Sequence, residues 1–66
     1  MNDHNIPDDV RDFATRLFTM AREGDLTLLD YINHGVDVNL SNQDGNTLLM
    51  LAAYAGQEEL VRGLVG

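Results

Sequence analysis

The chain contains no cysteine, and this absence removes several kinds of chemistry from its 66 residues. Without thiols it can form no disulfide framework and no thiolate site. A cysteine-free chain suits a reducing compartment, and the first nine residues, MNDHNIPDD, lack the basic and apolar regions of a secretory signal. The cytoplasm is therefore the expected location.

Basic residues are also scarce, since four Lys and Arg stand against eleven Asp and Glu and give a formal net charge of −7. Because nucleic-acid affinity depends on clustered basic side chains, we expect no binding to DNA or RNA. No apolar run approaches the roughly 20 residues that span a bilayer, so we expect no membrane contact. The negative field favours a protein partner with a basic patch, although acidic surfaces mostly serve solubility.

Catalytic and metal-binding patterns are missing as well. His4 and His34 are the only histidines, and a structural or solvated role is expected for both. The run from Asp37 has the look of a calcium loop, but Asn42 stands where the sixth-position glycine belongs and Leu48 where the twelfth-position glutamate belongs. With no phosphate-binding glycine loop, no nucleophile motif and no room for a catalytic domain, we expect neither enzymatic activity nor a cofactor.

Residues 44–64, DGNTLLMLAAYAGQEELVRGL, predict a turn followed by two short helices. In the turn tripeptide DGN at 44–46, the glycine takes positive φ at little cost, and the Asp and Asn side chains can bond nearby backbone amides. Thr47 is the expected N-cap of a first helix over 48–55, and Gly56 is its expected C′ glycine. An apolar repeat at i, i+1, i+4 and i+5 then predicts a second amphipathic helix with Leu60, Val61, Leu64 and Val65.

The first of these helices, 48–55, has almost no polar face, so neighbouring elements must cover most of it. An internal repeat supplies such neighbours. A shift of 32 residues places Asp12 on Asp44, Thr15 on Thr47, Leu17 on Leu49, Ala21 on Ala53, Gly24 on Gly56 and Leu28 on Leu60. A period in the low thirties with two helices per unit is typical of a solenoid.

The segment DGNTLLMLAAYAGQEELV resembles the ankyrin-repeat pattern DxxGxTPLHLAAxxGHLEIV, and the preceding GVDVN resembles that family's GADVN linker. The match extends from Phe13 to Val65. The resemblance implies an all-α solenoid of antiparallel helix pairs joined by turn-like linkers. It divides the single domain of residues 1–66 into an N-terminal capping repeat with its linker at 6–41 and a second, incomplete repeat at 42–66.

The chain departs from the family pattern at three places. Leu48 stands where the family has proline, and Met50 where it has histidine. These changes remove a preset φ and a side-chain hydrogen bond to the capping threonine, so we expect a looser helix start. The stretch from Gly24 to Gly35 is also one residue short, which the fold is expected to tolerate.

The residues at the two ends of the chain predict a polar capping helix at one end and an uncovered apolar helix face at the other. An apolar stripe from Ile6 to Ala21, with Pro7 near its start, predicts a long capping helix whose polar face closes the stack. The last helix has no polar capping repeat after it, so we expect either a longer array or a second copy of the chain at its apolar face. Contact through that face would use Leu60, Val61, Leu64 and Val65.

The resemblance also implies a binding surface, because turn tips and first helices form one continuous concave side in ankyrin-like stacks. When the family pattern is carried over residue by residue, the concave side of the second repeat includes Ser41, Gln43, Asp44, Asn46, Tyr54 and Ala55. The matching positions in the first repeat are Arg22 and Glu23. Tyr54 is the leading candidate, because tyrosine adds large amphipathic contact area at low entropic cost. Its alternative role is an aromatic lid over a neighbouring helix.

Three functions fit these features. The leading hypothesis is a protein-interaction module that recognises its partner through the rigid concave surface and makes or breaks no covalent bond. The alternatives are the N-terminal recognition part of a larger enzyme or regulator, and a self-assembly module that uses its open C-terminal face.

Overall fold

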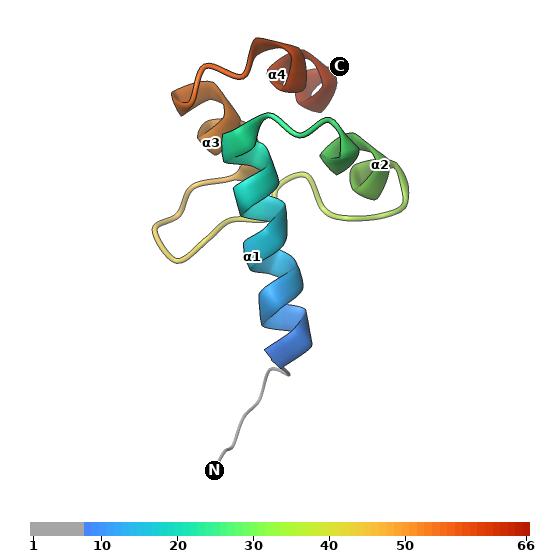
Figure 1. Ribbon diagram of the computed structural model, residues 1–66, viewed down its shortest axis with the longest axis vertical. Coiled ribbons are helices and arrows are strands. Elements are labelled where there is room, and N and C mark those ends of the chain that lie inside the picture. Colours follow the sequence, from blue (N-terminus) through green and yellow to red (C-terminus); the bar gives the residue numbers. More distant parts are fainter. Residues whose placement is uncertain (1–7) are drawn as a thin grey trace.

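Four helices form the described part of the molecule, and they come in two consecutive pairs (Figure 1). The computed structural model describes residues 8–66, with side chains from Arg11 onward. No strand occurs among these residues, in agreement with the predicted all-α fold. The pairs are α1 (Asp8–Glu23) with α2 (Thr27–Asn33), and α3 (Leu48–Tyr54) with α4 (Glu58–Val65).

The helix α1 is the longest of the four and extends past the others toward the N-terminus (Figure 1). A long helix was predicted here, and its capping role stays a prediction; Ile6 and Pro7 of the apolar stripe, like His4, lie outside the described residues. Thr15 lies inside α1, where its carbonyl oxygen accepts a hydrogen bond from Thr19 Oγ1 at 3.1 Å. Thr15 therefore caps no helix, and the 32-residue repeat does not hold in the first half of α1.

The same glycine-dependent motif ends the first helix of each pair. Gly24 and Gly56 both have a φ of +74°, a left-handed conformation that favours glycine. In each case the amide of the next residue donates to the carbonyl five residues back, at 3.0 Å for Asp25 and 2.9 Å for Gln57. These are Schellman closures, and their equivalence supports the 32-residue register for the second half of α1 and for α3.

A hydrogen-bonded turn over 42–46 precedes α3. Gly45 has the expected positive φ, +83°. The side chain that holds the turn belongs to Asn42, whose Oδ1 accepts the amides of Asp44 and Asn46, both at 3.0 Å. The sequence predicted this role for Asp44 and Asn46 themselves, but Asn42 stands at the first turn residue, from which a short side chain reaches the amides that follow.

Thr47 caps α3 as predicted. Its backbone is extended (φ −84°, ψ 171°), and its Oγ1 accepts the Met50 amide at 3.2 Å. Met50 Sδ in turn accepts the Thr47 amide at 3.5 Å, so the two residues form a capping box. A looser helix start was expected from the missing proline and histidine. The structure instead has a closed capping box, in which the methionine sulfur, although a weak acceptor, accepts the Thr47 amide.

The hydrophobic core lies between two layers of helices. α1 packs against α3, and α2 against α4, while each helix also contacts its partner within the pair. Leu60 is 1% exposed and belongs to this core, which corrects its expected place on the open C-terminal face. The buried set is Leu17, Phe18, Ala21, Leu28, Leu48, Leu51, Ala52 and Leu60.

The apolar helix α3 is covered on one side only within the described part of the chain. Leu48 and Ala52 are fully buried against the core, whereas Leu49 is half-buried and Ala53 is exposed. The sequence predicted cover on most sides. The difference arises because α1 and α4 pack against α3, and no described element covers the side that carries Ala53.

Candidate functional site

A groove of about 490 Å³ lies between α1 and the turn at 41–44, which project side by side in Figure 1. One wall is a helix of the first repeat and the other is the turn of the second repeat. The lining residues are Arg11, Ala14, Thr15, Phe18, Arg22, Ser41, Asn42, Gln43 and Asp44. The groove therefore exists only because the two repeats are stacked.

The α1 wall of the groove is a single stripe along the helix. Arg11, Thr15, Phe18 and Arg22 follow one another at intervals of four, three and four residues, which is the spacing of side chains on one helix face. Phe18 is 8% exposed and forms an apolar floor, while the arginines and Thr15 are exposed. The stripe thus has an exposed arginine near each end and the buried Phe18 between them.

The turn wall of the groove is held by backbone hydrogen bonds. The Asn42 amide donates to the Asn46 carbonyl at 2.9 Å, and the Gly45 amide donates to the Asn42 carbonyl at 3.0 Å. An isolated bridge between Ser41 and Thr47 closes the base of the turn. These bonds, together with the two accepted by Asn42 Oδ1, fix the direction of the exposed side chains at the tip.

The structure brings together four of the eight residues predicted for the concave surface. Arg22, Ser41, Gln43 and Asp44 all line the groove. The other four lie outside its lining: Asn46 is half-buried, and Glu23, Tyr54 and Ala55 are exposed. Tyr54 is 71% exposed, so it covers no helix as a lid within the described part of the chain.

Five lining residues were not among the predicted site residues: Arg11, Ala14, Thr15, Phe18 and Asn42. The helical spacing of the α1 stripe was readable from the sequence, but it indicated only a helix face. Its role as a groove wall depends on the turn of the next repeat, about 25 residues later along the chain, and this contact has no local sequence signal.

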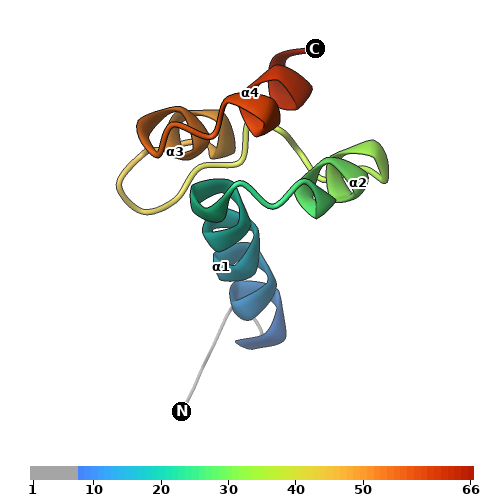
Figure 2. The same cartoon turned by 45° about the horizontal axis from the view of Figure 1, so that its top comes forward.

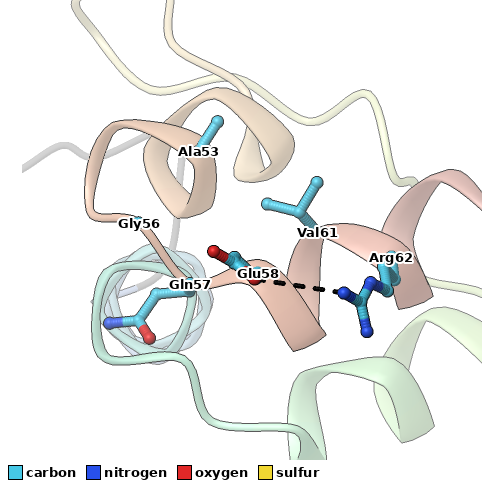
Figure 3. A pocket seen from close by; sticks show the side chains of 6 residues that line it. All are labelled: Ala53, Gly56, Gln57, Glu58, Val61 and Arg62. Atoms are coloured by element: carbon cyan, nitrogen blue, oxygen red, sulfur yellow. Dashed lines mark ion pairs between the residues drawn. The ribbon is translucent and has the colours of Figure 1, made fainter.

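A second hollow, of about 360 Å³, lies on the open side of the second repeat, where α3 meets α4 (Figure 3). Its lining consists of Ala53, Gly56, Gln57, Glu58, Val61 and Arg62. Glu58 and Arg62 form an ion pair of 3.9 Å across one α4 turn, with both side chains at least 80% exposed. Such an exposed pair adds little stability.

The inner side of the second repeat shows how such a hollow can be filled. Gln57 reaches back to the end of α1, where its Nε2 donates to the Arg22 carbonyl at 2.9 Å. A Cβ at Gly24 would overlap this side chain, with Gln57 Cδ at 2.6 Å, so the glycine makes room for it. Gly56, the repeat equivalent of Gly24, has the same φ but nothing within 4 Å of its Cβ position. The space beside Gly24 is thus filled by the Gln57 side chain, whereas the equivalent space beside Gly56 is open.

The described residues contain neither a cluster of metal-ligand side chains nor a membrane-spanning helix. No group of three or more His, Cys, Asp and Glu side chains between residues 8 and 66 is placed to hold a metal ion. No helix in that part of the chain combines the length and apolarity needed to cross a membrane.

Comparisons with known proteins agree with the helix pairs. A family model described as ankyrin repeats in three copies matches residues 15–66. A Pseudomonas aeruginosa protein named as an ankyrin repeat protein is 38% identical over 55 residues, which is 82% of this chain and 32% of the relative. The human ankyrin repeat domain-containing protein 29 is 50% identical over 54 residues, and its Danio rerio counterpart 44%, each match covering 79% of this chain and 18% of the relative.

The chain therefore spans between about a fifth and a third of the length of these relatives. No solved structure matches it significantly. The family model covers most of the chain, and its span includes both glycine closures and the threonine cap described above. The chain belongs to the ankyrin-repeat family, whose repeats serve generally as protein-interaction modules.

Proposed function

We propose that this chain is a protein-interaction module that binds its partner in the groove between α1 and the 41–44 turn, with no covalent chemistry. The observation that carries the proposal is the convergence of side chains from two repeats on one groove with an apolar floor and polar walls. Ligand sites typically combine these features. Arg22, Ser41, Gln43 and Asp44 are the predicted surface residues that would contact the partner.

The groove is suited to binding because little ordering is needed when a partner arrives. The turn wall is fixed by the Asn42 hydrogen bonds, and the helix wall by burial of Phe18 and Leu17. Binding to a preformed surface avoids much of the entropic cost of ordering loops. Tyr54, Ala55, Glu23 and Asn46 would extend the contact beyond the groove, and the exposed tyrosine offers the largest area.

A bulky side chain placed in the groove tests this function. We expect Thr15→Trp to lose the proteins that the native chain captures from a lysate, and to weaken direct binding of each by at least about tenfold, or about 1.4 kcal/mol. Arg16→Trp is the matched control, because Arg16 is exposed, is not part of the groove lining and lies about 100° round the helix from Thr15.

Binding is measured by titration calorimetry of each captured protein, and circular dichroism confirms that the variants keep their helix content. If all three chains bind the captured proteins equally, the groove is not the interaction surface. The proposal of groove binding must then be abandoned in favour of the C-terminal face.

A second role is stacking with a further helix pair of the same kind. The open space beside Gly56 supports it. The first repeat receives Gln57 at Gly24, and the second repeat presents the equivalent glycine in an unfilled hollow. Ala53 and Val61 supply the apolar part of this face. Leu60 is buried in the core, and Leu64, one turn later on α4, is half-buried and packs against the core. The occupant of the hollow would be a further helix pair, either of the same chain or of a second copy.

Extension of the chain by one repeat tests the stacking role. Gly66 stands 32 residues after His34, so a copy of residues 35–66 joined directly after Gly66 continues the repeat in register. At about 0.05–0.15 kcal/mol per residue, we expect the added 32 residues to raise the free energy of unfolding by about 2–5 kcal/mol. Urea denaturation followed by circular dichroism gives this value.

The control for the extended chain is Ala53→Glu, which places a charge in the open hollow. In the native chain Ala53 is exposed, so we expect the substitution to change stability by less than about 0.5 kcal/mol. In the extended chain it should remove most of the gain. An extended chain that is no more stable than the native one would rule out stacking at this face.

A further inference from the structure

The contact between the two helix pairs depends on two residues of the second pair, Gln57 and Gly63. Gln57, just before α4, donates from its Nε2 to the Arg22 carbonyl at 2.9 Å and fills the space beside Gly24. Gly63, inside α4, lies against Leu29, since a Cβ at this position would stand 2.8 Å from Leu29 Cδ2. The first pair thus receives a side-chain N–H donor at one point and a residue without a side chain at the other.

The groups of the first pair that receive these two residues recur on the open side of the second pair. In the 32-residue register they correspond to Tyr54, Gly56 and Val61. The space beside Gly56 is open, and Val61 lines the same hollow (Figure 3). The Tyr54 carbonyl, which corresponds to the Arg22 carbonyl, accepts no hydrogen bond within the described part of the chain. The open side therefore repeats the acceptor, the free space and the apolar side chain of the inner side.

An element that covers this hollow must meet two chemical requirements. It would take the Tyr54 carbonyl out of water, and a buried carbonyl without a donor is unfavourable, so the element must bring an N–H group there. It must also approach Val61 as closely as α4 approaches Leu29, because protein interiors are close-packed. A large side chain at the position equivalent to Gly63 would hold the covering helix away.

A second copy of this chain does not offer this combination on a free face. Its Gln57 and Gly63 already contact its own first pair, so it would have to dock through the outer side of that pair. The register places Asp25 and Tyr31 at the two equivalent positions there.

Neither of these residues meets the requirement. The Asp25 carboxylate only accepts hydrogen bonds, and its Oδ1 already accepts the Thr27 amide at 3.0 Å. Tyr31 brings a whole phenol ring, which packs edge-on against Phe13 with the ring centroids 5.5 Å apart. The first pair therefore lacks both the donor and the small residue.

We infer that the hollow beside Gly56 accepts a helix pair with a side-chain N–H donor just before its second helix and a glycine or alanine six residues later. Gln57 and Gly63 define this pattern in the existing contact. The inference rests on the proposed stacking role, because it names the residues that the stacked pair must carry. It also excludes a second copy docked head to tail, whose first pair has a carboxylate and a phenol ring at these positions.

The chain extended by a copy of residues 35–66 carries the required pattern in its added repeat and is the reference. In the test chain, the added copy alone contains Gln57→Asp with Gly63→Tyr, which introduces the residue types of the first pair. We expect the test chain to lose most of the increase in urea midpoint that the reference shows over the native chain.

The local effects of the two substitutions have the opposite sign. Gln57 makes no side-chain capping bond at the start of α4, and aspartate is a favoured N-cap residue. Tyrosine also has a higher helix propensity than glycine. Both changes should therefore favour the added helix itself, so a loss of stability reports on its contact with the preceding pair.

Glu59→Asp with Arg62→Tyr in the added copy is the matched control. Both residues are exposed in the existing second pair, so we expect the control chain to keep the urea midpoint of the reference. A test chain as stable as the reference would overturn the inference and leave the stacking role in place. A reference no more stable than the native chain would remove both.

NMR spectra of the native chain at increasing concentration test the excluded occupant. We expect the amide signals of residues 53–62 to keep their positions. Shifts of these signals that grow with concentration would make a second copy the occupant of the hollow and would also overturn the inference.

Discussion

Gly24→Ala is expected to lower the free energy of unfolding by about 3 kcal/mol, whereas Gly56→Ala should cost about 1–2 kcal/mol. Both glycines end a helix with φ +74°, so alanine meets the same backbone strain at each position. Only at Gly24 would the new Cβ overlap another residue, namely the Gln57 side chain, and break its hydrogen bond to the Arg22 carbonyl. Urea denaturation of the two variants gives the difference.

A double-mutant cycle separates the overlap from the backbone strain. Once Gln57→Ala has removed the obstructing side chain, Gly24→Ala should cost no more than Gly56→Ala does in the native chain. If Gly24→Ala costs the same with and without the glutamine side chain, then Gln57 does not hold the two repeats together as the structure indicates.

The second large effect is expected for Leu48→Ala, which should cost about 3–4 kcal/mol because it leaves a cavity in the core. Leu48 is 0% exposed and packs between α1 and α3. A chain of 66 residues has only roughly 3–10 kcal/mol of stability at typical per-residue values, so this single change should leave much of the protein unfolded at 37 °C. Thermal denaturation followed by circular dichroism measures the loss.

Leu49 is the matched control for this prediction. It is the next residue on the same helix, one turn before the exposed Ala53, and is only half-buried. Leu49→Ala should therefore cost about 1 kcal/mol in the native chain. In the chain extended by one repeat its cost should rise toward that of Leu48→Ala, because the added helices would bury it. Equal costs for the two leucines in the native chain would contradict the one-sided packing of α3.

Local signals in the sequence were sufficient for most of the helix boundaries. Thr47 caps α3 and Gly56 ends it, as the sequence predicts, because both roles depend on hydrogen bonds to residues within one or two turns. Local reasoning failed at the turn, where Asn42 rather than Asp44 holds the amides. Several neighbouring side chains could reach those amides, and the backbone path around the turn selects among them.

Part of the groove was also predictable. The repeat pattern placed Arg22, Ser41, Gln43 and Asp44 on one surface, and the structure places all four in one groove. The pattern gave no sign of Arg11 or Phe18, because it describes each repeat separately. The groove arises where the helix of one repeat meets the turn of the next, a relation that depends on how the repeats stack.

The sequence by itself determined the family, the all-α fold, the helix ends and the 32-residue period, since each follows from local hydrogen bonding or from the spacing of apolar residues. Only the tertiary structure decided which side of each apolar helix is buried. Figure 2 shows the two helix pairs packed against each other, with α4 beside both α3 and α2. Leu60 and Val61 are equally apolar neighbours, but α4 packs with only one side toward the first pair, so Leu60 enters the core while Val61 faces the open side.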